Sequence, residues 1–202
     1  MAEVGLQERG KAPAGLRERG KARRRAAIIR AAFELFAERG YDATTVADIA
    51  EAAEVAPRTV SMYFPAKQDI AMARFSDGVA GLNAALRGRK PGETLHQVFG
   101  RWLLNSQTEP EDREMYRLAR RMFAANPDLG ALRTARMVAA IREGAAMIAE
   151  ETGGQPDAIG PRIAAAAAAS IAMEIVDTEP GPEREEAVAT AMRFLEAGTA
   201  AL

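Results

Sequence analysis

The sequence has no cysteine and a single histidine, and these absences exclude several kinds of chemistry. Without cysteine the chain forms no disulfide and has no thiolate nucleophile, which fits a reducing compartment. One histidine cannot build a histidine cluster for zinc, and neither G-x-S-x-G nor H-E-x-x-H occurs. An enzyme is the main rival class of function. We expect instead a protein that is not an enzyme and that uses no metal and no cofactor.

Long uninterrupted apolar segments are also missing. The charged residues before Ala26 are not followed by the apolar stretch of a signal peptide. The longest run of small and apolar residues, Ile163 to Val176, contains Ser170 and Glu174 and is shorter than the roughly 20 residues of a membrane span. We therefore expect a cytoplasmic protein that makes no membrane contact.

Aromatic residues make up only 5% of the chain, whereas hydrophobic residues make up 48% and alanine is frequent. Alanine is the best helix former, and strands favour aromatic and β-branched residues, so the composition predicts an all-α fold with a sizeable core. Glycine and proline separate stretches of helical periodicity. We expect helices at about residues 21–39, 46–53, 57–64, 68–86, 94–106, 111–125, 129–152, 161–177 and 183–197.

Basic residues are concentrated at the N-terminus. Residues 1–30 contain nine Lys or Arg against three Glu, whereas the whole chain has a net charge of −1. Two near-repeats in this stretch each contain G-x4-G-K, but Ala12 and Ala22 stand where a nucleotide-binding loop has Ser or Thr. We expect residues 1–22 to form a flexible basic arm that contacts a polyanion such as DNA. The alternative is a solvated run of charges.

The first three predicted helices have the layout of a helix-turn-helix. Thr45 can cap the second helix, and Asp48 lies three residues later, near the positive end of the helix. Pro57 suits the first turn of the third helix, in which Val60 and Phe64 are expected to point inward. Both helices are too short to be stable alone, so we expect them to pack on the apolar face of the first.

Residues from about Ala26 to Ala73 resemble the DNA-binding domain of the TetR family of bacterial repressors. The resemblance rests on the order and spacing of four segments, residues 28–40, 41–50, 55–60 and 63–67. It implies an all-α protein with a three-helix helix-turn-helix DNA-binding domain at residues 23–67. A helical bundle at residues 68–202 would then sense a ligand and form the dimer.

The resemblance also implies a function. The chain is expected to be a sequence-specific transcriptional regulator, a repressor that a small hydrophobic or amphipathic effector releases from a palindromic operator on double-stranded DNA. A DNA-binding protein without an effector is the alternative. The sequence departs from the family pattern at Glu54, where glycine is common in the turn, at Ala56, where serine often caps the third helix, and at Ser61, where many members have tyrosine.

The expected DNA contacts centre on the third helix. Arg58 is the only charged residue of that helix and can bind guanine O6 and N7, the alternative being a phosphate contact. Thr59 could contact a base or a thymine methyl. The phenol of Tyr63 can donate to a phosphate or pack in the core. The full set of expected DNA-binding residues is Arg23, Arg24, Arg25, Thr45, Pro57, Arg58, Thr59, Ser61, Tyr63 and Lys67.

Two further sites follow from the resemblance. The last two helices are expected to form a homodimer bundle through small and apolar residues, the alternative being an internal core: Ile163, Ala166, Ala167, Ser170 and Ile171, with Val188, Ala191, Met192 and Leu195. A ligand pocket is expected among the middle helices, where a plain core is again the alternative. Its candidate residues are Phe99, Trp102, Met115, Tyr116, Arg120, Met122, Phe123, Met137 and Ile141, and His96 is a further polar candidate.

Overall fold

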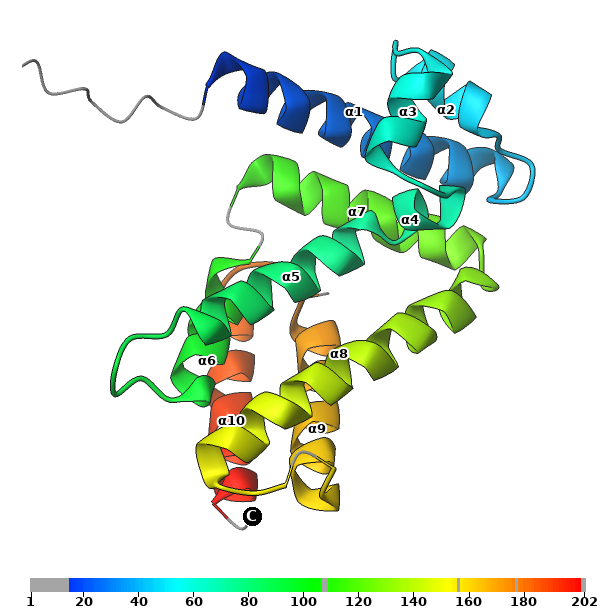
Figure 1. Ribbon diagram of the computed structural model, residues 1–202. Helices are drawn as coiled ribbons and strands as arrows, with labels where there is room; N and C mark the ends of the chain where they lie inside the picture. The colour runs from blue at the N-terminus through cyan, green and yellow to red at the C-terminus, as the bar shows by residue number, and fades with distance from the viewer. Residues whose placement is uncertain (1–14, 107–108, 156, 177, 201–202) are drawn as a thin grey trace, which may run out of the picture.

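The computed structural model describes residues 15–106, 109–155, 157–176 and 178–200, and this part of the chain is all-helical (Figure 1). Residues 1–14, most of the predicted basic arm, lie outside the described residues. The helices are α1 (Leu16–Arg39), α2 (Val46–Ala52), α3 (Pro57–Tyr63), α4 (Lys67–Ala71), α5 (Ala73–Arg87), α6 (Leu95–Asn105), α7 (Pro110–Ala125), α8 (Leu129–Thr152), α9 (Ile159–Val176) and α10 (Pro182–Thr199). The prediction of an all-α fold with an N-terminal helix-turn-helix is confirmed.

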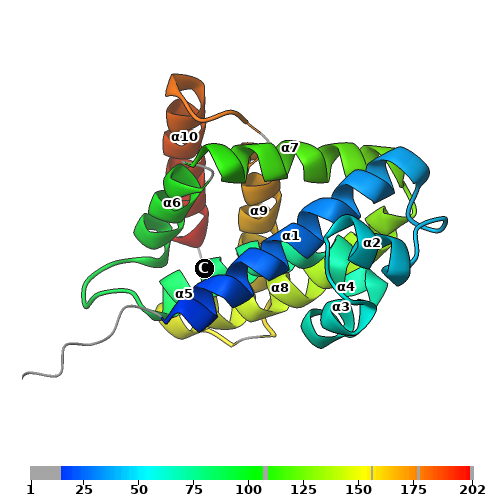
Figure 2. The same ribbon diagram turned by 90° about the horizontal axis from the view of Figure 1, so that it is seen from above.

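The N-terminal helices pack around one core that continues into the bundle. Ile28, Phe33 and Phe36 of α1 are fully buried, and Ile49 of α2 and Val60 of α3 join them. The same core includes residues of α4, α7 and the start of α8. Helix α1 lies along α7 in both views (Figures 1 and 2). The helix-turn-helix unit therefore packs directly on α7 through a shared core and is not joined to the bundle by the chain connection alone.

A second core holds the remaining helices together. It joins buried residues from the end of α5, from α6, from the second half of α8, and from α9 and α10. Helices α9 and α10 lie side by side, at the end of the molecule away from α2 and α3 (Figure 1). Helix α8 takes part in both cores, because its start contributes Leu129 to the first and its second half contributes Met147 to the second.

Two helix boundaries differ from the sequence-based prediction. Helix α1 begins at Leu16, five residues before the expected start at Lys21, so residues 16–22 are helical and not part of a flexible arm. The single helix expected at residues 68–86 is two helices, α4 and α5, which meet at Met72 (φ −94°, ψ 4°). Residues 70–73 are all buried. Four consecutive residues cover most of the circumference of a helix, so the chain is enclosed by neighbouring helices at this junction.

Asn126 ties the end of α7 to the helix-turn-helix unit. This buried side chain donates to the carbonyl oxygens of Phe36 and Met122, each at 2.8 Å. Its own oxygen accepts from the backbone N–H of Tyr41 at 2.6 Å. Asn126 therefore satisfies backbone groups on both sides of the junction.

Ion pairs add further links between the unit and the bundle. They are half-exposed, so each contributes little to stability and serves mainly to set the geometry. The pairs that join α1 or α4 to the bundle are Arg25–Asp77 at 2.7 Å, Arg30–Glu114 at 2.7 Å and Arg136–Asp69 at 2.6 Å.

Helix α9 is unusually apolar and poorly covered. Its 18 residues have a mean hydropathy of 1.4, and only 22% of them are buried within the chain. By length and composition alone it could cross a membrane, contrary to the sequence-based expectation that it is too short. Ile159 and Ile163 are 67% and 61% exposed, and Phe194 of the adjacent α10 is 64% exposed. This end of the molecule therefore presents apolar side chains that one chain does not cover.

Candidate nucleic-acid interface and ligand cavity

Helix α2 begins with a reciprocal cap formed by Thr45 and Asp48. The backbone N–H of Asp48 donates to Thr45 Oγ1 at 3.1 Å, and the backbone N–H of Thr45 donates to the Asp48 carboxylate at 2.7 Å. The Thr45 hydroxyl also donates to that carboxylate at 2.7 Å. These hydrogen bonds, first that of the side chain and then that of the backbone, hold the pKa of Asp48 below its ordinary value. The capping role predicted for Thr45 and Asp48 is confirmed.

Glu54 makes the turn between α2 and α3 with a positive φ of 53°. The backbone N–H of Val55 then donates to the carbonyl of Ala50 at 2.9 Å, which closes the end of α2. A left-handed conformation costs a non-glycine residue roughly 1–2 kcal/mol. Glu54 thus adopts the positive φ that glycine takes without strain, and the chain accepts this cost.

Helix α3 has a buried face and an exposed face. Val60 and Phe64, at the end of the helix, are 1% and 5% exposed, as expected for inward residues. Arg58, Ser61 and Met62 are exposed on the other side. Met62 is 78% exposed, and the sequence analysis missed it. Its position four residues after Arg58, on the same helical face, was the available signal.

The start of α3 is more exposed still. Pro57 is the first helical residue and Ala56 provides no side-chain cap, in line with the missing serine. The Ser61 hydroxyl donates to the Pro57 carbonyl at 3.4 Å, and Thr59 is half-buried. Among the described residues Arg58 has no hydrogen-bond or ion-pair partner. Its guanidinium is therefore available to a ligand of the exposed face.

The three arginines before Ala26 do not have the same environment. Arg23 and Arg24 are exposed on α1, and Arg24 Nε donates to the hydroxyl of Tyr63 at 3.4 Å. Arg25 instead makes two hydrogen bonds to Asp77, at 2.7 and 2.8 Å, and its guanidinium lies 5.3 Å from the centre of the Phe64 ring. The structure thus brings Arg24 and Tyr63 together and directs Arg25 to α5.

The Lys67 side chain makes hydrogen bonds within the protein. Its ammonium donates to the carbonyl oxygens of Tyr41 at 2.7 Å and Thr44 at 2.9 Å, and it lies 4.2 Å from the centre of the Tyr41 ring. Burial is the main cause that raises the pKa of the Tyr41 phenol, so the ring remains neutral beneath the cation. Two of the three N–H groups of Lys67 are engaged in this way. The structure favours a role in closing the loop before α2 over the expected phosphate contact.

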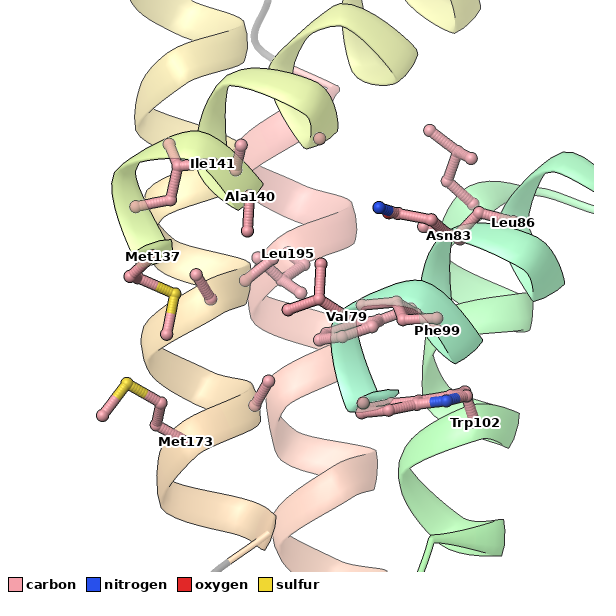
Figure 3. A pocket seen from close by; sticks show the side chains of 18 of the residues that line it. Val79, Asn83, Leu86, Phe99, Trp102, Met137, Ala140, Ile141, Met173 and Leu195 are labelled. Atoms are coloured by element: carbon pink, nitrogen blue, oxygen red, sulfur yellow. The ribbon is translucent and has the colours of Figure 1, made fainter. Parts of the chain in front are cut away.

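A large cavity lies among the helices of the bundle. Its volume is about 710 Å³, within the range of small-molecule sites. Side chains from α5, α6, α7, α8, α9 and α10 line it, and most of them are apolar (Figure 3). The rings of Phe99 and Trp102 lie nearly parallel, 8° apart, with centres separated by 6.5 Å. These two rings form one wall of the cavity, and Met137 and Ile141 of α8 lie across from them (Figure 3).

Most of the predicted pocket residues line this cavity. Phe99, Trp102, Tyr116, Arg120, Phe123, Met137, Ile141 and His96 all do. Met115 and Met122 do not, because they point to the opposite side of α7 and are buried in the core beneath α1. Their assignment to the pocket is wrong. Helical periodicity placed them on one face of α7, but only the packing of α1 shows which face the core uses.

The sequence analysis missed several polar residues of the cavity. Arg74 follows the α4–α5 junction, Arg133 lies in the second turn of α8, and both line the cavity. Glu151 and Glu196 lie at the other end, together with the hydrogen bond between His96 Nε2 and Thr199 Oγ1 at 3.0 Å. No sequence signal marks these residues, because helices distant in the chain bring them together.

The predicted dimer residues divide into two groups. Val188, Ala191 and Leu195 are 3%, 8% and 5% exposed and belong to the second core, so they do not face outward. Met192, Ala167 and Ile171 pack against the same core. The internal-core alternative therefore holds for Val188, Ala191 and Leu195, and the rest of the predicted seam stays a prediction. Ile163 and Ser170 stay exposed, and Ala166 is half-buried.

Comparison with known proteins gives one family match and one curated relative. Residues 28–73 match the model of the bacterial regulatory proteins of the tetR family. The relative is the HTH-type transcriptional regulator TcmR of Streptomyces glaucescens, 43% identical over 77 residues, which are 38% of this chain and 34% of TcmR. The chain thus spans about a third of the length of the curated relative that it matches.

Solved structures match over most of the chain. Salmonella enterica GusR is 18% identical with a TM-score of 0.61, covering 95% of this chain and 100% of GusR. A TetR-family regulator from Rhodococcus sp. is 24% identical with a TM-score of 0.54, covering 88% and 99%. NalD of Pseudomonas aeruginosa, the secondary repressor of the MexAB-OprM efflux pump, is 18% identical with a TM-score of 0.51, covering 87% and 96%. At these identities the likeness shows the fold.

Proposed function

We propose that this chain is a DNA-binding transcriptional regulator of the TetR type, because residues 28–73 match the model of the bacterial regulatory proteins of the tetR family. In this proposal it is a cytoplasmic homodimeric repressor, and a small apolar or amphipathic effector that enters the cavity releases it from a palindromic operator. The proposed division is a DNA-binding domain at residues 23–67 and a sensing and dimerisation domain at residues 68–202.

The exposed face of α3 is the observation that carries the proposal. A capped α2 and the core beneath Val60 hold α3 rigidly, while Arg58 and Met62 remain exposed. A helix enters the major groove with its N-terminal side chains on the base edges, so Arg58 would bind guanine and Met62 would contact an apolar edge such as a thymine methyl. Arg24 and Tyr63 would contact the phosphates on the flank.

A second copy of the chain would cover the apolar end of the bundle. Operators of this kind are read by two identical units related by a twofold axis. The exposed residues Ile159, Ile163 and Phe194 of α9 and α10 support an interface between copies at this place. A desolvated interface would also account for an 18-residue helix of which only 22% is buried in one chain.

The cavity lies close to the elements that hold the DNA-binding unit. Arg74 lines it only two residues after Met72, where α4 meets α5. On α8, Met137 lines it, and its neighbour Arg136 pairs with Asp69 of α4 at 2.6 Å. An effector that displaces α5 or α8 would therefore move α4 and the DNA-binding unit attached to it. In the proposed dimer, the distance between the two DNA-binding units would then no longer match the spacing of the DNA grooves.

The central experiment measures DNA recognition. The purified protein selects an operator from a random duplex library, and fluorescence anisotropy then compares that operator with unrelated DNA. Arg58→Ala should weaken operator binding by about 1–3 kcal/mol and leave unrelated DNA nearly unchanged. Arg142→Ala, at an exposed position of α8, is the matched control and should change neither. A failure of the wild type to select any sequence would contradict the proposed function.

A second experiment distinguishes the effector-controlled repressor from a DNA-binding protein without an effector. Trp102 is the only tryptophan and lines the cavity, so its fluorescence reports on ligands that enter. Any ligand that weakens operator binding must itself bind less tightly to the operator complex by the same factor, because coupling is reciprocal. Equal ligand affinity with and without operator would favour the alternative.

A further inference from the structure

We propose that the cavity binds an amphipathic anion, whose apolar body lies on the Phe99–Trp102 wall and whose acidic group lies among the arginines at the end nearest the DNA-binding unit. This inference deepens the proposed function and rests on the cavity being the effector site. It names the chemical class of the effector: an aromatic or aliphatic body of small-molecule size with one carboxylate, sulfonate or ionised phenol.

Two arginine–aromatic pairs mark the cationic end. The guanidinium of Arg74 lies 4.8 Å from the centre of the Tyr116 ring, and that of Arg133 lies 4.8 Å from the centre of the Phe123 ring. Tyr116 and Phe123 are seven residues apart on α7, which separates the pairs by about 10 Å along the helix. Each ring already has a cation over one face, so a cationic ligand at this end would meet a charge of the same sign.

The cationic end of the cavity has more hydrogen-bond donors than acceptors. Arg74 makes one ion pair, Nη2 to Asp112 at 3.1 Å, and its Nε is buried without a partner. Among the described residues Arg133 has no carboxylate partner. The indole N–H of Trp102 likewise makes no hydrogen bond to any described residue. A buried or half-buried donor without an acceptor is costly, so a ligand that brings acceptors is favoured here.

Acidic groups are held at the other end of the cavity. Glu151 accepts from the backbone N–H of Leu95 at 3.3 and 3.4 Å and pairs with Arg89 at 3.6 Å. Glu196 lines the same end from α10 and is exposed to solvent. Helix α10 ends far from α7 in the bundle (Figure 1). These two carboxylates therefore lie away from the arginines. Among the described residues, Asp112 is the one carboxylate that pairs with Arg74 or Arg133, so the cationic end keeps an excess of positive charge.

The remaining wall suits an apolar body. Between the two ends the cavity is lined by side chains such as Val79, Phe99, Met137 and Ile141 (Figure 3). The nearly parallel Phe99 and Trp102 rings can stack on a planar group, and methionine adapts to its outline. The volume of about 710 Å³ allows a body of two or three rings or a chain of similar size.

A pair of fluorescent probes tests the charge preference directly. Anilinonaphthalene sulfonate and N-phenylnaphthylamine share the same apolar body and differ by one sulfonate. Energy transfer from Trp102 reports binding of each probe to the full-length protein, and titrations give the two dissociation constants. We expect the wild type to bind the sulfonate at least fivefold more tightly than the neutral probe. Equal affinities, or a preference for the neutral probe, would overturn the proposal.

Variants of α8 locate the anion within the cavity. Arg133→Met keeps the length of the side chain and removes its charge, and it should weaken the sulfonate about tenfold while leaving the neutral probe unchanged. Arg133→Lys should keep most of the affinity. Arg142→Met, at an exposed position of the same helix, is the matched control for charge and should change neither probe. Equal losses of both probes in Arg133→Met would show a packing role for Arg133 and overturn the assignment.

The same preparations separate this inference from the proposed function. Operator binding of each variant is measured by anisotropy with and without the sulfonate probe. If the cavity prefers the anionic probe but the probe does not weaken operator binding, the cavity chemistry is supported. The same result contradicts release from the operator by this ligand class. Loss of operator binding by the wild type contradicts the proposed function alone, because the two probes still report the charge preference of the cavity.

Discussion

Replacing Asn126 with alanine should destabilise the junction between the helix-turn-helix unit and the bundle. The side chain donates to the carbonyls of Phe36 and Met122, each at 2.8 Å, and accepts from the backbone N–H of Tyr41 at 2.6 Å. It is 9% exposed, so water does not readily replace it. Alanine would leave the buried Phe36 carbonyl and the part-buried Tyr41 N–H without this partner.

The magnitude follows from those orphaned groups. Each buried polar group that loses its partner costs roughly 1–3 kcal/mol, so we expect a loss of about 2–5 kcal/mol in the free energy of unfolding. Urea denaturation with linear extrapolation measures it, and the melting temperature should fall by roughly 2–4 °C for each kcal/mol. Asn83→Ala is the control, because Asn83 makes one part-buried hydrogen bond to Glu143. A loss for Asn126→Ala no larger than the control would refute the reasoning.

Three further predictions concern the cap, the response to acid and the dimer. Thr45→Ala should cost about 1 kcal/mol of unfolding free energy through the lost cap, and urea denaturation measures it. The hydrogen bond from Arg30 holds the pKa of Glu114 below its ordinary value. The pair therefore stabilises the fold at pH values above that ordinary pKa, and this contribution is lost as the pH falls through the depressed pKa. Glu114→Gln should lose less stability between pH 7 and pH 3 than the wild type does, and an equal loss would contradict this assignment. Ile163→Glu should yield monomers in light scattering, whereas Val138→Glu, at another exposed apolar position, should not; a dimeric Ile163→Glu would move the interface elsewhere.

Local signals in the sequence predicted most of the secondary structure and the helix-turn-helix. The cap at Thr45 and the proline at the start of α3 act within one helical turn, so their partners are adjacent in the chain and visible in the sequence. The inward positions of Val60 and Phe64 follow from helical periodicity. The same locality explains why the resemblance over residues 28–73 was recognisable from residue spacing alone.

Long-range packing decided the rest. Whether Met122 faces the cavity or the α1 core depends on where α1 lies, and α1 is more than 80 residues away in the sequence. The partners of Arg25 and Lys67 are likewise 52 and 23 to 26 residues distant, so the sequence did not show that these two expected DNA-binding residues also make internal hydrogen bonds.

The cavity shows the same division. Its aromatic and methionine residues were recognisable as apolar helix faces, but its charge pattern was not. Arg74 and Arg133 come from separate helices and meet only through α7, where each covers an aromatic ring. Periodicity specifies which residues share a face of one helix, whereas the field inside a cavity is the sum over several helices and depends on their relative placement. The sequence by itself thus determined the helices, their caps and the DNA-binding unit, and only the tertiary structure decided which faces meet, because those contacts join residues that no local rule connects.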